Sequence, residues 1–461
     1  MLKVFSHYFP SHTLFKILTD AVLLCVAIVA ALVWQLDAAK VDWRLVVPSA
    51  GLFALAMIAL NSALGLYRPQ RSASARDALV RVLLGVAVSV PVAIGVFWVL
   101  PWDHFATEAV QLTVLLLLGS VLALRGALNR RQERALFTRR ALIVGGGEEA
   151  ASVEQVLRHP SVSGMELVGF YLPNDAEAAK VDPQRVVGRG MSLLDVARQL
   201  RVGQVIVAVR ERRGGVLPLR ELLDCKLQGI AVHDLSSFYE HTSGHVRLDA
   251  LKASWLIYGD GFRQGRARAF VKRGFDLVAA SVLLLLALPV MLLTMLAILL
   301  EDGAPVFYRQ ERVGQAGRVF KVIKFRSMRR DAERDGKPRW AAANDDRVTR
   351  VGRLIRRLRI DELPQLFNVL SGQMSLVGPR PERPFFVDQL TRDIPFYAVR
   401  HGVKPGLTGW AQVRYQYGAS VDDAINKLEY DLYYVKHHSL VLDILILVET
   451  VRVVLTGEGA H

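Results

Sequence analysis

The stretch Arg356–Glu382 reads RRLRIDELPQLFNVLSGQMSLVGPRPE, and it combines two adjacent carboxylates with several arginines and prolines. Asp361 and Glu362 stand just ahead of Pro364. Because proline is best tolerated in the first turn of a helix, the sequence predicts that a helix starts here. A helix start is the positive end of the helix dipole, so it keeps a carboxylate ionised and attracts phosphate oxygens.

An ionised carboxylate in this position could attack phosphorus as a covalent nucleophile. It could also hold Mg²⁺, which bridges phosphate oxygens and neutralises developing charge. Attack on a phosphate anion needs nearby cations, and five arginines are close in the sequence: Arg353, Arg356, Arg357, Arg359 and Arg380. Arg380 lies between two prolines, and a stiff backbone suits a fixed bidentate phosphate clamp.

The same residues also allow an interpretation without chemistry. Asp361 would then cap a helix, Glu362 would be solvated, and the arginines would lie on anionic lipid headgroups. The residues alone leave these two interpretations open.

Upstream of this stretch lies an apolar segment, Leu277–Leu300, with Pro289 near its centre. A central proline removes a helical hydrogen bond and kinks or breaks the helix, at a cost of about 3 kcal/mol. Both flanks carry the positive charge that is typical of cytoplasmic loops: Lys272, Arg273, Arg309, Arg312, Arg318, Lys321 and Lys324. We predict that residues 268–303 form a membrane helix that bends at Pro289 and returns to the same side. A fifth span with a tolerated proline is the alternative.

The N-terminal third contains four further apolar blocks: Leu14–Leu36, Val46–Leu66, Val82–Leu100 and Leu112–Leu128. Each block is close to the ~20 residues that cross a bilayer. Lys and Arg are concentrated in alternate loops, which predicts that both ends of this unit face the cytoplasm. The sequence therefore predicts a four-helix transmembrane bundle over residues 1–135. Its spans carry no charge near their centres, which favours an anchor over a transport path.

Residues 139–245 alternate between predicted strands and helices. The strands are predicted at Arg140–Val144, Leu167–Tyr171, Gln204–Val209 and Ile230–His233, and the helices at Leu193–Arg201 and Leu219–Gln228. Such alternation predicts a Rossmann-like α/β domain with a parallel sheet. A linker over 246–267 and a catalytic domain over 304–461 complete the expected organisation.

The first turn of this α/β domain has the form G-x-G-x-x-A, with Gly145, Gly147 and Ala150. This pattern could seat a pyrophosphate on a helix N-terminus. Glu148 and Glu149 would repel phosphate at that place, so a tight turn without a ligand is favoured. The sequence leaves open what this domain binds.

The chain has 461 residues, of which 52% are hydrophobic and 22% charged, and its net charge is +15. The apolar residues must therefore be segregated into blocks beside basic soluble domains. A basic excess favours nucleic acid, anionic lipid or phosphorylated substrates as partners. Nucleic acid is disfavoured, because no zinc-finger spacing, RNP-like strand or helix-turn-helix pattern is present. Cys25 and Cys225 lie in separate regions, which fits a reducing compartment.

Four motifs of the C-terminal region occur together in one known family. They are Lys272-Arg273-x-Phe275-Asp276, Lys324–Met328, Arg356–Glu382 and Thr408–Gln412. From about Lys272 to Leu455 the chain resembles the monotopic polyprenyl-phosphate phosphoglycosyl transferases, whose fold is an α+β catalytic domain with a re-entrant membrane helix. The four spans and the Rossmann-like domain resemble the large exopolysaccharide-initiating subgroup, of the undecaprenyl-phosphate glucose/galactose phosphotransferase type.

The resemblance implies a mechanism in two steps. Asp361 would attack the β-phosphate of a UDP-sugar with the help of Mg²⁺, which releases UMP and forms a phosphosugar–enzyme ester. Undecaprenyl phosphate would then displace Asp361 and give the polyprenyl-diphosphate-sugar. Glu362 would be the second member of a catalytic dyad, helping with the metal or with deprotonation of the acceptor.

The resemblance also implies further site residues and a location. Arg356 and Arg380 match family positions that bind phosphate, and Lys324, Arg326 and Lys404 in neighbouring motifs are further candidates. Asp361 would be the metal ligand. We expect the protein in the bacterial inner membrane, in contact with lipid and with both soluble domains on the cytoplasmic side. Glucose or galactose is the expected sugar, and a homodimer through the spans is compatible with the sequence.

The chain departs from the family pattern in two places. Leu288 precedes the helix-bending proline where family members often have serine, so another group must satisfy the backbone that Pro289 frees. Gln373 occupies a position where aspartate is usual, and we assign no metal binding to it.

Two other functions are weighed against this one. A catalytically inactive membrane scaffold for polysaccharide assembly would not need the intact Asp361-Glu362 pair. A membrane-bound nucleotide-sugar dehydratase would need a Tyr-x-x-x-Lys pair, and no tyrosine in this sequence is followed by lysine four residues later.

Two segments near the C-terminus complete the predictions. Leu440–Leu455 is apolar but carries Asp443, Glu449 and Arg452, which predicts an interfacial amphipathic helix. The acidic aromatic cluster at 429–434 is predicted to form an aromatic belt at the membrane surface. Contact of that cluster with a nucleotide or sugar is the alternative.

Overall fold

The computed structural model describes residues 2–4, 7–9, 15–23, 25–26, 43–63, 138–158, 165–173, 180–188, 190–209, 217–249, 251, 261–262, 265–330, 332, 347–415 and 420–456. The chain divides between Ser243 and Gly244 into two compact units. This division falls close to residue 245, where the Rossmann-like domain was predicted to end.

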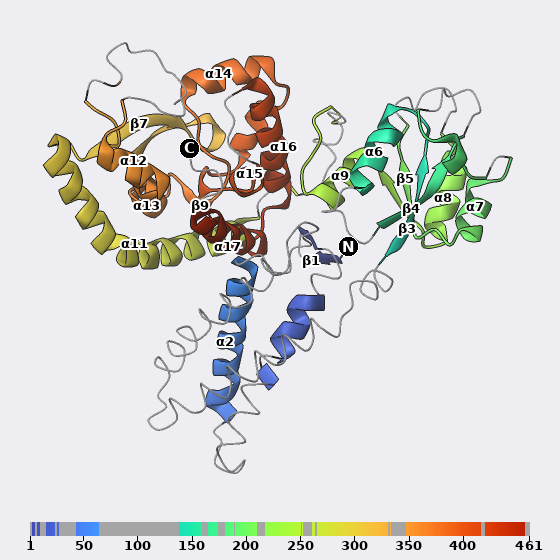
Figure 1. Ribbon diagram of the computed structural model, residues 1–461, viewed down its shortest axis with the longest axis horizontal. Coiled ribbons are helices and arrows are strands. Elements are labelled where there is room, and N and C mark those ends of the chain that lie inside the picture. Colours follow the sequence, from blue (N-terminus) through green and yellow to red (C-terminus); the bar gives the residue numbers. More distant parts are fainter. Residues whose placement is uncertain are drawn as a thin grey trace. The chain divides into compact units, whose positions relative to one another are not determined.

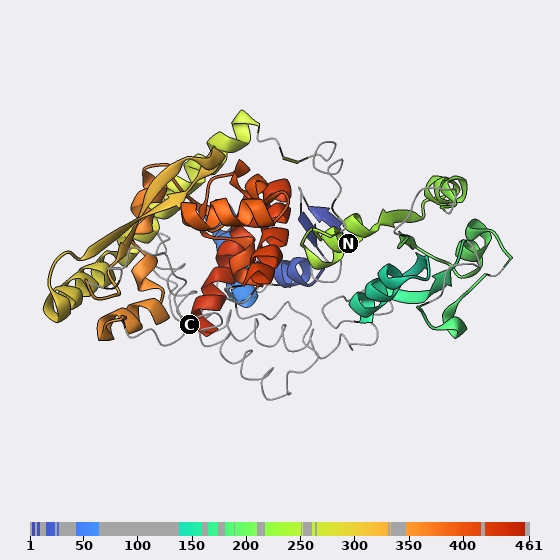
Figure 2. The same ribbon diagram turned by 90° about the horizontal axis from the view of Figure 1, so that it is seen from above.

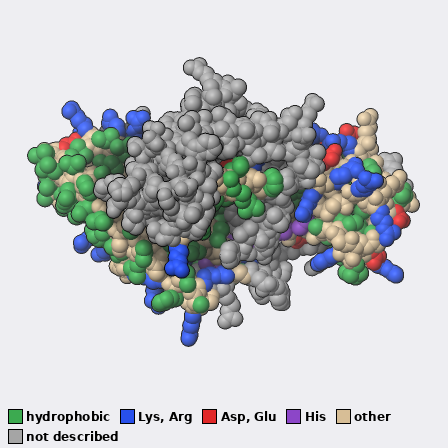
Figure 3. All heavy atoms as spheres, turned by 90° about the horizontal axis from the view of Figure 1, so that it is seen from below, with side chains coloured by type: hydrophobic (Ala, Val, Ile, Leu, Met, Phe, Trp, Pro, Cys, Tyr) green, Lys and Arg blue, Asp and Glu red, His purple; other side chains and the backbone are tan. Residues whose placement is uncertain are grey.

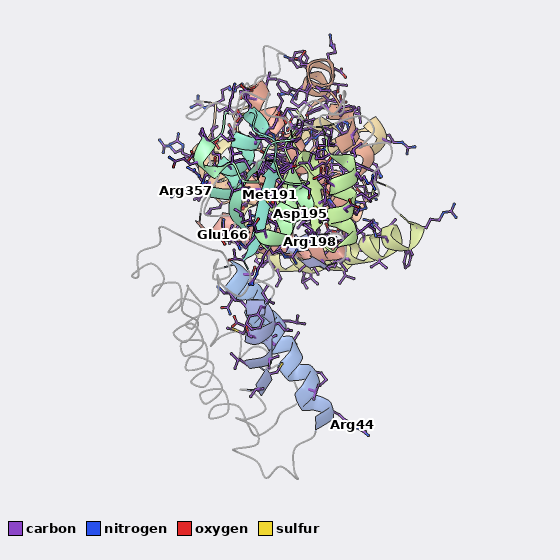
Figure 4. The ribbon with its side chains drawn as sticks, turned by 90° about the vertical axis from the view of Figure 1, so that its right-hand side faces the viewer. Arg44, Glu166, Met191, Asp195, Arg198 and Arg357 are labelled. Carbon is purple, nitrogen blue, oxygen red and sulfur yellow. The ribbon has the colours of Figure 1, made fainter. Side chains whose placement is uncertain are left out.

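In the N-terminal region the structure describes short strands β1 (Leu2–Val4) and β2 (His7–Phe9) and a helical stretch over 15–23. Helix α2 (Trp43–Ala63) covers most of the second predicted span, and Arg44 lies in its first turn (Figure 4).

The predicted spans Val82–Leu100 and Leu112–Leu128 lie outside the described residues, as does the second half of Leu14–Leu36. The four-span bundle therefore stays a prediction.

The first unit contains the predicted parallel sheet (Figure 1), with strands in the order β4-β3-β5-β6. The strands are β3 (Arg139–Val144), β4 (Met165–Tyr171), β5 (Gln204–Val207) and β6 (Ala231–Asp234). The helices are α6 (Glu148–Arg158), α7 (Leu193–Gln199), α8 (Leu219–Leu227) and α9 (Leu235–Ser243), with a 3₁₀ turn η2 at Pro183–Arg185. The prediction of a Rossmann-like α/β domain is confirmed.

The central strand β3 is buried on both faces, because alternate residues of a strand point to opposite sides of the sheet. Ala141 and Ile143 pack in the core cluster that includes α6 and α9 residues, while Leu142 and Val144 pack in the cluster that includes α7 and α8 residues. A continuous apolar run is typical of such a doubly covered parallel strand.

The glycine turn after β3 is tight. A Cβ at Gly145, whose φ is +121°, would lie 2.7 Å from the carbonyl oxygen of Ala208. The backbone N–H of Lys180 donates to the carbonyl of Gly146 at 2.8 Å, and its side chain pairs with Glu148. A segment of the chain thus lies against the turn.

The second unit combines helices with two small sheets (Figures 1 and 2). Its strands are β7 (Phe307–Val313) and β8 (Val319–Phe325), which form an antiparallel hairpin, and β9 (Ser375–Val377) and β10 (Gly406–Thr408), which pair in parallel. Its helices are α11 (Arg266–Asp302), α12 (Arg350–Arg357), α13 (Gln365–Leu370), α14 (Pro384–Asp393), α15 (Trp410–Arg414), α16 (Val421–His437) and α17 (Leu440–Thr456). 3₁₀ turns η3, η4 and η5 lie at Gln315–Gly317, Ile360–Glu362 and Tyr397–Gly402.

Helix α11 is held by the second unit at both of its ends. Near its start, Lys272 Nζ lies 2.7 Å from a carboxylate oxygen of Asp443, and Arg273 donates to carbonyl oxygens at the end of α13. At its other end, the Glu301 carboxylate accepts the backbone N–H groups of Arg350 and Val351, the first residues of α12. Both ends of α11 are therefore tied to one domain.

Between these ends, α11 presents a long apolar surface, and among the described residues it is the helix long and apolar enough to cross a membrane. Hydrophobic side chains gather over it (Figure 3). Its exposed members include Leu283, Leu285, Leu286, Leu288, Leu292, Leu293, Leu296 and Leu300. The helix is continuous through Pro289, and α11 is curved along its length (Figure 1).

Two C-terminal predictions need correction. Tyr433 and Tyr434 are buried in the core, and the Tyr434 hydroxyl donates to the Asp443 carboxylate at 2.7 Å, so the predicted aromatic belt is wrong. Helix α17 forms as predicted, but its acidic residues Asp443 and Glu449 are buried. They pair with Lys272 and Arg414, so this part of the polar face points into the domain.

The Lys272–Asp443 pair generates a stability prediction. Asp443 is 1% exposed, and removing one partner of a buried ion pair costs about 3–5 kcal/mol because the other charge stays buried. We expect Lys272→Met to lower the free energy of unfolding by that amount, measured by denaturant unfolding in detergent with tryptophan fluorescence. Arg268→Met, at an exposed position of the same helix, is the matched control. Equal effects of the two substitutions would contradict this account.

Candidate active site

The two carboxylates lie in a short turn between two helices. Helix α12 ends at Arg357, and Arg359 adopts a left-handed conformation with φ of 58°. The chain then forms the 3₁₀ turn η4, which contains Asp361 and Glu362, and Pro364 occupies the N-cap position of α13. The predicted place at a helix start is therefore found, with a 3₁₀ turn ahead of the helix. Both carboxylates are turned inward, with 8% and 9% of their residue surfaces exposed.

Glu362 is neutralised by two cations. One of its carboxylate oxygens accepts hydrogen bonds from Lys324 Nζ at 3.0 Å and from Arg380 Nη2 at 2.7 Å. Burial alone would raise the pKa of Glu362, but Arg380 and Lys324 outweigh burial and hold the pKa well below its usual range. Glu362 therefore stays ionised at neutral pH and is a weak base.

Asp361 has a different environment. Its carboxylate makes no hydrogen bond or ion pair with any residue that the structure describes. Burial and the neighbouring Glu362 raise the pKa of Asp361, against the opposing charges of Lys324, Arg356 and Arg380. Adjacent carboxyl groups with pKa values moved in opposite directions are typical of acids that divide two roles between them. Here Glu362 is committed to cations and Asp361 is available.

Three of the five predicted phosphate-binding residues gather at this pair. Lys324 comes from β8, Arg356 from the last turn of α12, and Arg380 from the loop between β9 and α14. Arg326, in contrast, is buried and donates to the carbonyl oxygens of Asp302 and Gly303, at 3.1 and 2.7 Å. It closes the end of α11, so its contacts are structural.

Lys404 is the other predicted residue that lies elsewhere. Burial and the neighbouring Arg273 lower its pKa, and Asp276 and Lys272 are also close enough to affect it. These neighbours belong to the first half of α11. Lys404 therefore lies by the start of that helix, whereas the carboxylate pair precedes α13.

Sequence reasoning missed the polar residues that support the site from inside. Asn368, 2% exposed, accepts the backbone N–H of Ile323 at 3.0 Å and donates to the carbonyl of Lys321 at 2.8 Å, which ties α13 to β8 beside Lys324. It also donates to Gln373 at 2.8 Å, so this glutamine has a structural partner. An asparagine on an otherwise apolar helix face was the available signal.

Asp276 is a second supporting residue. It is 3% exposed, and it accepts the Ser375 hydroxyl at 3.1 Å and the Leu376 N–H at 3.2 Å. The aspartate of the Lys-Arg-x-Phe-Asp motif thus anchors α11 to the start of β9. Its position in the sequence gave no indication of that partner.

A Mg²⁺ ion would find one open carboxylate in the described part of the site, that of Asp361. The described residues contain no group of three or more His, Cys, Asp or Glu that could hold a metal. Mg²⁺ often uses only one or two carboxylates and takes its other ligands from substrate phosphates and water. Because Glu362 is occupied by cations, the open carboxylate of Asp361 fits an ion that binds together with a phosphorylated substrate.

Comparison with known proteins identifies two regions of the chain. Residues 267–457 match the family described as bacterial sugar transferase, and residues 62–215 match the family described as CoA-binding domain. The first region contains α11 and the carboxylate pair, and the second contains β3, β4 and β5.

Individual relatives agree with the first match. The chain is 48% identical over 242 residues to UDP-N-acetylgalactosamine-undecaprenyl-phosphate N-acetylgalactosaminephosphotransferase of Aeromonas hydrophila, covering 52% of this chain and 56% of that protein. It is 47% identical over 186 residues to undecaprenyl-phosphate glucose phosphotransferase of Komagataeibacter xylinus, covering 39% of this chain and 35% of that one. These two alignments thus span about half or less of the relatives' lengths.

A longer alignment joins the chain to UDP-glucose:undecaprenyl-phosphate glucose-1-phosphate transferase of Escherichia coli strain K12. The two are 33% identical over 330 residues, which cover 70% of each chain. With two thirds of that relative covered, the similarity extends beyond the transferase region alone. The chain therefore belongs to the bacterial sugar transferase family.

Proposed function

We propose that this protein transfers a sugar-1-phosphate from a UDP-sugar to undecaprenyl phosphate, as the first membrane step of polysaccharide synthesis. The products are UMP and undecaprenyl-diphosphate-sugar. The observation that carries the proposal is the division of the carboxylate pair, in which Lys324 and Arg380 neutralise Glu362 and Asp361 is left available. The names of the related transferases support the same reaction.

In the first step, a carboxylate oxygen of Asp361 attacks the phosphorus that carries the sugar. A phosphorus–oxygen bond forms to Asp361, the bond to the UMP oxygen breaks, and UMP leaves with the electron pair. Three positive charges act on this carboxylate, those of Arg356, Arg380 and Lys324. They would offset the repulsion between the carboxylate and the phosphate oxygens.

In the second step, an oxygen of undecaprenyl phosphate attacks the same phosphorus, and Asp361 departs as a carboxylate. The second displacement breaks the bond between Asp361 and phosphorus that the first one formed, so the free Asp361 carboxylate is restored. Glu362 serves this chemistry by holding Lys324 and Arg380 in place. A carboxylate whose pKa is held well below its usual range is too weak a base to deprotonate the acceptor.

Mg²⁺, held by Asp361 together with the substrate phosphates, would neutralise charge on the phosphate oxygens. The relatives' names point to hexoses as the transferred sugar, namely N-acetylgalactosamine, glucose and galactose. Glucose and galactose remain the expected donors, and the Aeromonas relative adds UDP-N-acetylgalactosamine to the donors to be tested.

We propose further that α11 inserts into the cytoplasmic membrane as a re-entrant helix and presents the active site to the carrier lipid from the cytoplasmic side. Both ends of α11 contact the same domain, and its middle is apolar and exposed. A crossing helix would place its ends about 30 Å apart on opposite sides of the bilayer. The ends could then not both dock on one domain that lies on one side.

The nucleophile is tested by measuring UMP release from a panel of UDP-sugars with undecaprenyl phosphate, and by mass spectrometry of trapped enzyme. We expect Asp361→Asn to lose at least about 10³-fold in turnover, since an amide cannot attack phosphorus. A phosphosugar adduct should appear on the wild-type peptide containing Asp361 and be absent from the variant. Asp388→Asn, an exposed acid on α14, is the control. Full activity of Asp361→Asn would exclude the covalent mechanism.

Removal of divalent metal tests the assignment of Mg²⁺. We expect a chelator to abolish UMP release and added Mg²⁺ to restore it, because the phosphate charge is then neutralised again. Binding of Mn²⁺, followed by electron paramagnetic resonance in the presence of UMP, should weaken in Asp361→Asn and persist in Asp388→Asn. Unchanged activity in chelator would remove the metal from the mechanism.

The topology of α11 is tested with single cysteines at Arg266 and Ala304, both exposed near the ends of the helix, in a background with Cys25→Ser and Cys225→Ser. A membrane-impermeant maleimide should label both positions in inside-out vesicles and neither position in right-side-out vesicles. Labelling of the two positions from opposite sides would mean that α11 crosses the membrane.

A further inference from the structure

The loop that carries Arg380 is held in place by hydrogen bonds to its backbone carbonyl groups. Two of its residues are prolines, which have no N–H to donate. Four consecutive carbonyl oxygens accept hydrogen bonds from other segments: Pro379 from Gly406 N at 3.0 Å, Arg380 from Arg400 Nη2 at 3.0 Å, Pro381 from Arg312 Nη1 at 3.2 Å and Glu382 from Val313 N at 2.9 Å. The carbonyl of the functional residue itself is therefore held by a side chain, Arg400.

Arg400 is an unusual donor for this purpose, because it is only 5% exposed. Its Nε and Nη2 atoms lie 3.0 and 2.7 Å from one carboxylate oxygen of Asp431, and Nη1 donates to the Tyr397 hydroxyl at 3.0 Å. Asp431, on α16, is 1% exposed. Two partners, Asp431 and Tyr397, thus fix the orientation of the guanidinium that donates to the carbonyl of Arg380.

A buried ion pair of this kind requires an explanation. Replacing such a pair with apolar residues of similar volume is often neutral or stabilising, so net stability is a weak reason for its presence. The guanidinium of an arginine is planar and rigid, so it donates to several acceptors in fixed directions. A lysine ammonium is a single charge on a flexible stem and does not fix those directions. The hydrogen bonds of Arg400, which lies in η5, connect α16, η5 and the loop of Arg380.

We propose that Arg400, oriented by Asp431, is a positioning residue that sets the place of Arg380 and through it the neutralisation of Glu362. The line of contacts runs from Asp431 to Arg400, to the Arg380 carbonyl, and from the Arg380 guanidinium to Glu362 at 2.7 Å. None of these contacts requires Arg400 to touch substrate. This proposal rests on the proposed function only in the test that measures UMP release, because the hydrogen-exchange test needs no activity.

The first test does not depend on activity. The amides of Gly406 and Val313 donate to carbonyl groups on either side of Arg380, so their hydrogen exchange reports whether the loop is held. In full-length protein in nanodiscs, we expect Arg400→Lys and Asp431→Asn to speed exchange at both amides. Tyr397→Phe removes a partner of Arg400 that does not touch the loop, so exchange should stay close to wild type. Unchanged exchange in both Arg400→Lys and Asp431→Asn would overturn the proposal.

The second test compares kcat and KM for UMP release in the wild type and in Arg400→Lys. The contact that should be weakened is the one between the Arg380 guanidinium and the Glu362 carboxylate, which are 2.7 Å apart in the wild type. We expect kcat to fall about 10- to 100-fold, as for misplaced catalytic groups, with KM changed less. A drop in melting temperature with unchanged kcat would mean that Arg400 is structural only.

The two tests separate this proposal from the proposed function. A wild-type protein that releases no UMP from any UDP-sugar would refute the transferase function, and the exchange rates would still decide the role of Arg400. An active wild type whose Arg400→Lys variant keeps slow exchange and the wild-type kcat would refute only the positioning role.

Discussion

The site depends on the neutralisation of one buried carboxylate. Glu362 accepts hydrogen bonds from Lys324 and Arg380 on the same oxygen, and these three residues come from a hairpin, a 3₁₀ turn and a loop after β9. A buried charge left without its partner costs several kcal/mol, so each of the three segments constrains the other two. The same arrangement leaves Asp361 as the carboxylate that can react.

Helix α11 is the second constraint, because it meets two environments. Its ends are polar and are held by ion pairs and hydrogen bonds to the catalytic domain, whereas its exposed middle consists of leucine and other apolar side chains. The end of α11 caps α12 through Glu301, and the last turn of α12 carries Arg356 beside the carboxylate pair. Helix α12 therefore connects the end of α11 to the carboxylate pair.

Several features could be predicted because they depend on short-range physical rules. The alternation of apolar strands and helices predicted the parallel sheet with boundaries within two residues for most elements, since burial on both faces leaves a regular pattern. Pro364 marked the start of α13, whereas α11 runs on through Pro289 as one helix. The predicted aromatic belt was wrong. A tyrosine can lie at a membrane surface or in a core, and it suits a core when its hydroxyl group has a hydrogen-bond partner. Tyr434 has such a partner in Asp443.

The sequence by itself determined the Rossmann-like pattern, the apolar segment with its central proline, and the adjacent carboxylates Asp361 and Glu362. Only the tertiary structure decided which cations serve them. Arg326 and Lys324 are two residues apart, yet Lys324 reaches Glu362 whereas Arg326 closes the end of α11. Arg400 showed no role in the sequence, and Asp431 was included only in the cluster predicted to form an aromatic belt. A basic side chain looks the same whether it binds a substrate, a helix end or a loop carbonyl, because its partner is chosen by contacts between segments that are distant in the chain.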